Sequence, residues 1–161
     1  CMELYPENAE LLAFKLREAA ADGSADRVTQ LLSQVPESAS TDNRFYHYMG
    51  WLHETLGENE RAIEAYRDAL RLNPFDWRSQ LKLAATLRLI GEDSEADRLA
   101  QLAVDGKDLR ETIMRLADVQ TIPMSVLLSM QDYCRRCGDD LVSNGLAKRI
   151  EMIQQQLDTK S

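Results

Sequence analysis

Cys134 and Cys137 have the spacing of a redox centre, Cys-x-x-Cys. A redox motif of this kind places its first cysteine at the N-terminus of a helix, where the dipole and free N–H groups stabilise the thiolate. Here the pair comes at the end of a predicted helix, directly before Gly138, where the dipole has the opposite sign. Arg135 and Arg136 offset part of that effect. We therefore interpret the cysteines as structural, with redox activity as the open alternative.

The two histidines, His47 and His53, do not complete a catalytic or metal site. Both lie more than 80 residues from Cys134, so the cysteine pair lacks the further ligands of a zinc site. No serine or cysteine stands near His47 in a nucleophile arrangement, and His53 is assigned to the core. The sequence also lacks a glycine-rich phosphate loop, an EF-hand loop and an HExxH motif. We expect a protein that is not an enzyme, with no catalytic residues, cofactor or metal.

Composition and charge fit a soluble protein of one domain. The chain has 161 residues, of which 44% are hydrophobic and 29% charged, and a net charge of -8. This charge argues against binding to nucleic acids or membrane surfaces, although a local basic strip is compatible with it. No apolar run approaches the ~18 residues of a membrane span. Leu, Ala, Glu and Arg dominate, so we expect helices.

The chain begins with Cys1 rather than methionine. We expect a processed product or a piece of a longer protein, with a lipid-modified N-terminal cysteine as the alternative. The compartment stays open: the cytoplasm is favoured, and a lipoprotein or periplasmic origin is retained.

The elements that would position these side chains follow a repeat. Gly23, Gly57 and Gly91 are spaced by 34 residues twice over, each between two amphipathic stretches. A glycine at such a point ends a helix in the left-handed conformation. The spacing therefore predicts successive helix pairs of about equal length.

The middle unit resembles the tetratricopeptide repeat family. The residues that carry the resemblance are Tyr46, Met49, Gly50, His53, Ala62, Tyr66, Ala69 and Asn73-Pro74. His53 stands where the family prefers tyrosine. Gly50 and Ala62 would let two antiparallel helices approach closely, and Pro74 would end the second helix. The resemblance implies an all-α, right-handed α-solenoid of antiparallel helix pairs, and a bundle of helix-turn-helix units is the alternative.

We divide the predicted single domain, 1–161, into about four helix pairs and a C-terminal capping helix. The units are 8–42 (degenerate), 43–76 and 77–108 (clear) and 109–137 (degenerate), with the capping helix at 139–157. The first unit is expected to contain helices Asn8–Ala21 and Ala25–Gln34, and the fourth Leu109–Val119 and Met124–Cys137.

By the same resemblance, the first helix of each pair lines a concave, partner-binding surface. On the second unit the face beside the expected buried stripe (Tyr46, Met49, Gly50, His53) is basic and aromatic. The equivalent face of the first unit carries Glu10, Ala13, Phe14 and Arg17. The predicted partner-binding residues are Arg44, His47, Tyr48, Trp51, Arg78, Lys82, Arg88 and Arg115. The alternative is that the aromatic residues pack on a neighbouring helix and the arginines pair with local carboxylates.

We expect a non-catalytic adaptor that binds a peptide segment of a partner, acidic or C-terminal, in this groove. A carboxylate clamp for chaperone tails is disfavoured, because His47 and Trp51 occupy positions where that clamp uses lysine and asparagine. The alternative function is the repeat region of a larger enzyme, such as a transferase, with its chemistry elsewhere. Self-association through the terminal units is also retained.

Overall fold

The computed structural model describes residues 8–116 and 122–158, and in these ranges all regular structure is helical, as predicted. Contacts divide the chain into two compact units, Cys1–Ala100 and Gln101–Ser161. Within the described ranges no helix combines the length and hydropathy needed to cross a bilayer. The predictions for Cys1 and for the end of Leu109–Val119 fall outside the described residues.

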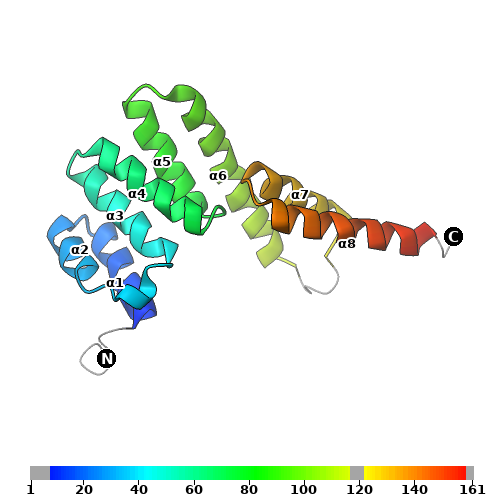
Figure 1. Cartoon of the computed structure of the whole chain (residues 1–161), viewed down its shortest axis with the longest axis horizontal. Helices are drawn as coiled ribbons and strands as arrows, with labels where there is room; N and C mark the ends of the chain where they lie inside the picture. Colours follow the sequence, from blue (N-terminus) through cyan, green and yellow to red (C-terminus); the bar gives the residue numbers. More distant parts are fainter. Residues whose placement is uncertain (1–7, 117–121, 159–161) are drawn as a thin grey trace. The chain divides into compact units, whose positions relative to one another are not determined.

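In chain order the helices are α1 (Ala9–Ala21), α2 (Ala25–Leu32), the 3-10 helix η1 (Glu37–Ala39), α3 (Asn43–Thr55), α4 (Asn59–Leu72), α5 (Trp77–Leu89), α6 (Asp93–Met114), α7 (Met124–Arg136) and α8 (Asp140–Asp158). Short turns join α1 to α2, α3 to α4, α4 to α5, α5 to α6 and α7 to α8, and a longer segment that contains a 3-10 helix joins α2 to α3 (Figure 1).

Side-chain caps begin four of the described helices, with Asp139 accepting from the Val142 N–H at the start of α8, and glycines follow four of them. Asn8 accepts from the Leu11 N–H, as expected of an N-cap, and aspartates that begin α3 and α5 accept in the same way. The three phased glycines adopt positive φ, at +71°, +76° and +84°, and Gly138 does so after α7. The 34-residue spacing therefore marks helix ends, as predicted.

Helices α3 and α4 lie side by side as an antiparallel pair (Figure 1). Gly50 makes this packing close: a Cβ at this position would lie 2.5 Å from Tyr66 Cδ1. Tyr66 is fully buried, and its hydroxyl donates to Glu54 at 2.7 Å. The buried residues of α3 are Phe45, Gly50 and Leu52.

The expected buried stripe on α3 is therefore wrong in part. Tyr46, Met49 and His53 are only half-buried. His53 is not a core histidine, because its Nδ1 lies 2.7 Å from Glu58 Oε2 in the turn after α3. The core instead takes Phe45 and Leu52, which pack with α1 and α2.

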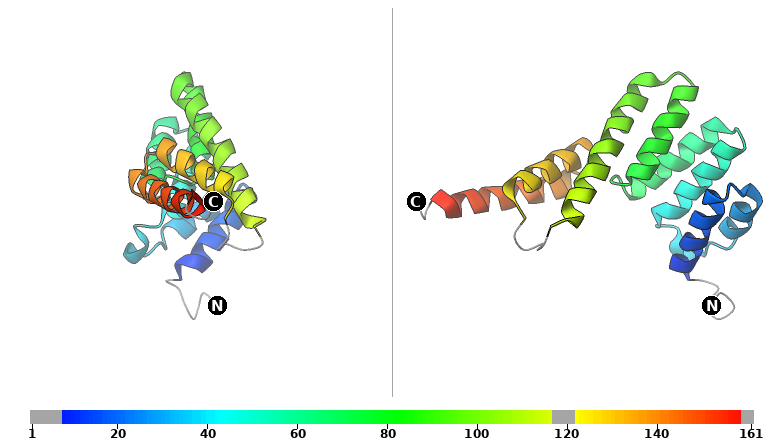
Figure 2. Two further views of the ribbon diagram at one scale, coloured as in Figure 1. Left: turned by 90° about the vertical axis from the view of Figure 1, so that its right-hand side faces the viewer. Right: turned by 180° about the vertical axis from the view of Figure 1, so that it is seen from behind.

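The C-terminal helices differ from the prediction. The helix expected to start at Leu109 does not exist as a separate element, because α6 continues through Asp108 to Met114. Where Pro74 follows the end of α4, the third unit has Asp108, which allows the helix to continue. The fourth pair is α7 with α8, which lie alongside each other (Figure 2). The helix predicted as a lone cap is therefore a member of a pair. The single-domain interpretation stays a prediction.

Candidate partner-binding groove

A groove of about 750 Å³ opens within Cys1–Ala100, along the first helices of the helix pairs. Five of the eight predicted partner-binding residues line it: Arg44, His47, Tyr48, Trp51 and Arg78. The other residues of its wall are mainly those of the equivalent face of α1, Glu10, Ala13, Phe14 and Arg17, together with Asn43, Asn73 and Asp76. The groove therefore combines the same face of three successive units.

Three aromatic rings lie along this groove. Phe14 on α1 is 46% exposed. Tyr48 and Trp51 on α3 are half-buried and pack against the core formed by α1, α2 and α3. These two rings thus rest on neighbouring helices and also line the groove. A half-buried aromatic ring can bury further area on a ligand at little cost in side-chain entropy.

Arg44 is saturated by carboxylates of this chain. Its two terminal nitrogens donate to the two oxygens of Glu10, each at 2.7 Å, and its Nε donates to Asp42 at 2.9 Å. These hydrogen bonds hold the pKa of Glu10 and the pKa of Asp42 below their ordinary values. Arg44 therefore ties α3 to α1 and is not available to a ligand's carboxylate.

Two other guanidinium groups at the groove stack on rings. Arg17 Cζ lies 4.8 Å from the centroid of Phe14, and Arg78 Cζ lies 4.6 Å from the centroid of Trp77. No carboxylate in the described part of the chain lies within 4.0 Å of either guanidinium. Burial raises the pKa of Tyr48, and the charges of Arg17 and Arg78 partly oppose that rise. The positive charges of both guanidiniums therefore affect the Tyr48 side chain.

A series of side-chain hydrogen bonds joins α3 to the start of α5 beside the groove. Ser79 Oγ donates to Asp76 at 2.7 Å, Asn43 donates to the same carboxylate at 3.0 Å, and His47 Nδ1 lies 2.9 Å from Ser79 Oγ. Because the single hydroxyl proton of Ser79 goes to Asp76, His47 Nδ1 is the donor to Ser79. Burial lowers the pKa of His47, which keeps the ring neutral.

This chain of bonds is not a nucleophile arrangement. A serine nucleophile donates its proton to the histidine, whereas Ser79 accepts from His47 and is completely buried. His47, Ser79 and Asp76 instead fix the register of α3 against α5. Asp76 was not among the predicted site residues, although its position just before Trp77 is that of a helix N-cap.

The remaining predicted residues do not line the groove, and each has a carboxylate partner. Lys82 donates to Glu54 at 3.0 Å, and Arg88 donates to Asp97 at 2.7 Å. Arg115 follows α6, in the other unit, and lies 3.5 Å from Glu111. The groove is therefore lined by fewer cationic side chains than the sequence predicts.

The cysteine pair lies at the C-terminal end of α7, as the sequence predicts. Cys134 is buried and Cys137 is the C-cap residue, and the described residues contain no disulfide between them. Burial raises the pKa of Cys134, and the neighbouring Asp139 raises it further. A raised pKa disfavours the thiolate that a redox centre needs.

The family of the central helix pair follows from its sequence. A family model described as "Tetratricopeptide repeat" matches residues 44–76, which hold α3 and α4 with their Gly50–Tyr66 contact. The chain contains a tetratricopeptide repeat. Tetratricopeptide repeats are protein-interaction modules, and stacked repeats present concave binding surfaces.

Two known proteins are similar to this chain. A curated protein of Pseudomonas putida, "Probable biofilm formation methyltransferase WspC", is 35% identical over 98 residues, 59% of this chain. The match spans 22% of the length of that relative. The crystal structure of MamA aligns with a TM-score of 0.56 at 16% identity, over 99% of this chain and 85% of that one. This likeness and the helix pairs support the predicted all-α solenoid fold of the tetratricopeptide type.

Proposed function

We propose that the groove along α1, α3 and α5 binds an acidic or C-terminal peptide segment of a partner protein. The observation that carries the proposal is the placement of two guanidiniums without a carboxylate partner among the described residues, Arg17 and Arg78, on either side of Tyr48 and Trp51. An apolar or aromatic side chain of the ligand would lie on the rings. Its carboxylates would then reach the arginines, where charge-assisted hydrogen bonds form.

Selection from a random peptide library on the immobilised chain tests this proposal. We expect enrichment of segments that join carboxylates to an aromatic or large apolar residue. Arg78→Glu should abolish retention of these peptides while the helical content and melting temperature stay unchanged. Trp51→Ala should also abolish retention at a temperature where the helical content is kept, although its melting temperature should fall because the ring packs on the core. Arg88→Glu, which makes the same charge change outside the groove, should retain them.

Two outcomes would contradict the proposal. One is that the enriched peptides bind Trp51→Ala and Arg78→Glu as well as they bind the unaltered chain. The other is that Arg88→Glu removes binding to the same degree, because net charge rather than the groove would then decide retention.

The likeness to WspC favours a second candidate, in which these residues form the repeat region of a longer enzyme, such as a methyltransferase. The groove would then bring a partner or substrate protein to chemistry located elsewhere. The mass of the native gene product tests this directly. A product no longer than the present chain would exclude it, and neither result alters the peptide-binding proposal.

A further inference from the structure

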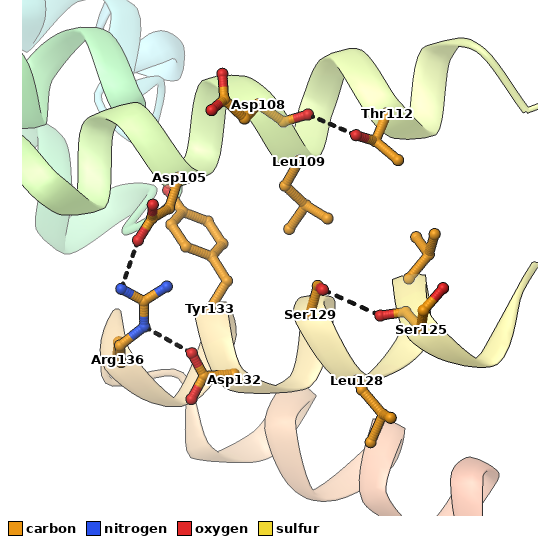
Figure 3. A pocket seen from close by; sticks show the side chains of 11 residues that line it. Asp105, Asp108, Leu109, Thr112, Ser125, Leu128, Ser129, Asp132, Tyr133 and Arg136 are labelled. Carbon is orange, nitrogen blue, oxygen red and sulfur yellow. Dashed lines mark hydrogen bonds and ion pairs between the residues drawn. The ribbon is translucent and has the colours of Figure 1, made fainter.

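A second groove lies entirely within Gln101–Ser161, between α6 and α7, with a volume of about 680 Å³ (Figure 3). Its α6 wall includes Asp105, Asp108 and Leu109, and its α7 wall includes Val126, Asp132 and Arg136. It contains none of the residues proposed above to bind an acidic segment. An inference about it therefore stands apart from that function.

The two helices that form the walls of this groove are in contact at Gly106 and Tyr133. At Gly106 a Cβ would lie 2.1 Å from the Tyr133 hydroxyl oxygen, so the helices are in close contact there. Further along, Leu109 points into the space between the helices (Figure 3). Leu109 and Val126 are only half-buried, so the groove has an apolar wall that remains open to a ligand.

Some polar side chains that line this groove have hydrogen-bond or ion-pair partners in the chain, and the Asp108 carboxylate has no cation close to it among the described residues. Arg136 donates to Asp105 at 2.6 Å and to Asp132 at 2.8 Å, which closes one end of the groove (Figure 3). The Thr112 hydroxyl donates to the backbone of its own helix at 2.9 Å. The Asp108 carboxylate is exposed, and no cation of the described residues lies within 4.0 Å of it.

The lining therefore holds three carboxylates and one guanidinium, a formal charge of -2, beside an apolar wall. A ligand that complements this surface must carry positive charge and an apolar side chain together. We propose that this groove binds a basic, amphipathic segment of a partner protein, with an apolar side chain between Leu109 and Val126 and a Lys or Arg beside Asp108. It would give the chain a second interaction surface of opposite charge preference to the first.

The test uses the full chain and two synthetic probes. One is a short amphipathic peptide of Leu and Lys, and the other has every Lys replaced by Glu. Fluorescence anisotropy measures the dissociation constant of each, and amide chemical shifts of the isotope-labelled chain locate the contact. We expect the Lys peptide to bind more tightly than the Glu peptide and to shift Leu109, Val126 and Ser129.

Asp108→Lys should weaken the Lys peptide roughly tenfold, because it places a like charge beside the ligand's cation. The matched control is Glu64→Lys, which makes the same charge change on the exposed face of α4 and should leave binding unaltered. Both positions are exposed, so neither variant should disturb folding, and circular dichroism checks this.

Three results would overturn the proposal. The Glu peptide could bind as tightly as the Lys peptide, the two variants could weaken binding equally, or the shifts could fall outside the groove. Concentration-dependent self-association that disappears in Asp108→Lys would assign the groove to a second copy of the chain instead, and sedimentation velocity measures it.

Discussion

In each compact unit a glycine–tyrosine contact brings two helices close together. In each unit one arginine also forms ion pairs that join two helices. In Cys1–Ala100 the contact is Gly50 with Tyr66, and in Gln101–Ser161 it is Gly106 with Tyr133. The contacts differ in which part of the tyrosine meets the glycine. Gly50 faces the ring carbons of a fully buried Tyr66, whereas Gly106 faces the hydroxyl end of Tyr133. A methyl group added at Gly50 would therefore meet the middle of a ring, whereas one added at Gly106 would meet the end of a side chain.

The bridging arginines differ in the geometry of their ion pairs. Arg44 joins Glu10 on α1 to Asp42 at the start of α3, and Arg136 joins Asp105 on α6 to Asp132 on α7. Arg44 donates to both oxygens of Glu10, each at 2.7 Å, whereas Arg136 donates to one oxygen of Asp105 at 2.6 Å. The exposure of the carboxylates does not separate the two bridges, because Glu10 is 79% exposed and Asp105 only 30%. Since bidentate pairs are the stronger arrangement, we expect Arg44 to contribute more to stability than Arg136.

The largest effect is expected from Gly50→Ala. The new methyl group would displace the Tyr66 ring, which overpacks a filled core, and the gain of about 1 kcal/mol in helix propensity offsets only part of that. We expect the free energy of unfolding to fall by about 2 kcal/mol, measured by urea denaturation. Unchanged stability would mean that the ring can move after all, and the contrast between the two contacts would be lost.

Gly106→Ala should cost less, about 1 kcal/mol, because the methyl group meets the end of the Tyr133 side chain rather than the middle of a ring. Removing the nearest atom should then recover part of the loss. In a double-mutant cycle we expect positive coupling between Gly106→Ala and Tyr133→Phe, and none between Gly50→Ala and Tyr66→Phe. Equal coupling in both cycles would contradict the proposed difference.

Arg44→Gln should lower the free energy of unfolding by about 0.5–1 kcal/mol near neutral pH, and Arg136→Gln by less. The pKa of Asp42 is lowered by its hydrogen bonds to Arg44, so its contribution is present above the unfolded pKa of 3.8 and is lost as the pH falls below it. The unaltered chain should therefore lose more stability than Arg44→Gln between neutral pH and about pH 3. Thermal melts at the two pH values measure this, and parallel losses would count against the Arg44 bridge.

The smallest effect is a gain. Gly145 lies within α8, and a Cβ there would meet nothing within 4 Å. Gly145→Ala should raise the free energy of unfolding by about 0.5–1 kcal/mol through helix propensity alone. It is the matched control for both glycine contacts, since it adds the same methyl group without a facing tyrosine. A loss of stability at Gly145 would show that the other two losses do not report the tyrosine contacts.

Much of the fold could be predicted because it depends on local chemistry. The 34-residue spacing of Gly23, Gly57 and Gly91 required only that a glycine end each helix in the left-handed conformation. The continuation of α6 was missed because an aspartate at position 108 does not force a helix to end or to continue. The pairing of α7 with α8 depends on where α6 ends, and no local signal in the sequence defined that end.

The sequence predicted five of the residues that line the groove, but it did not predict which charged groups there are already paired. Helical spacing was enough to place Arg44, His47, Tyr48 and Trp51 on one face. The loss of Arg44 as a binding residue could have been foreseen, because Glu10 stands 34 residues before it, at the equivalent position of the preceding unit. The role of Asp76 under His47 could not, because it depends on how α3 and α5 approach each other.

The sequence by itself determined the class of the fold, the phase of its repeats and the face that the first helices of three successive repeats present. These depend on propensity and periodicity, which act within a few residues of each other along the chain. The tertiary structure decided which charges on that face remain available, with Arg44 saturated by carboxylates and Arg17 and Arg78 stacked on rings. Ion pairing falls off within a few ångströms, so it is set by the distances between helices, and these are fixed only when the helices pack.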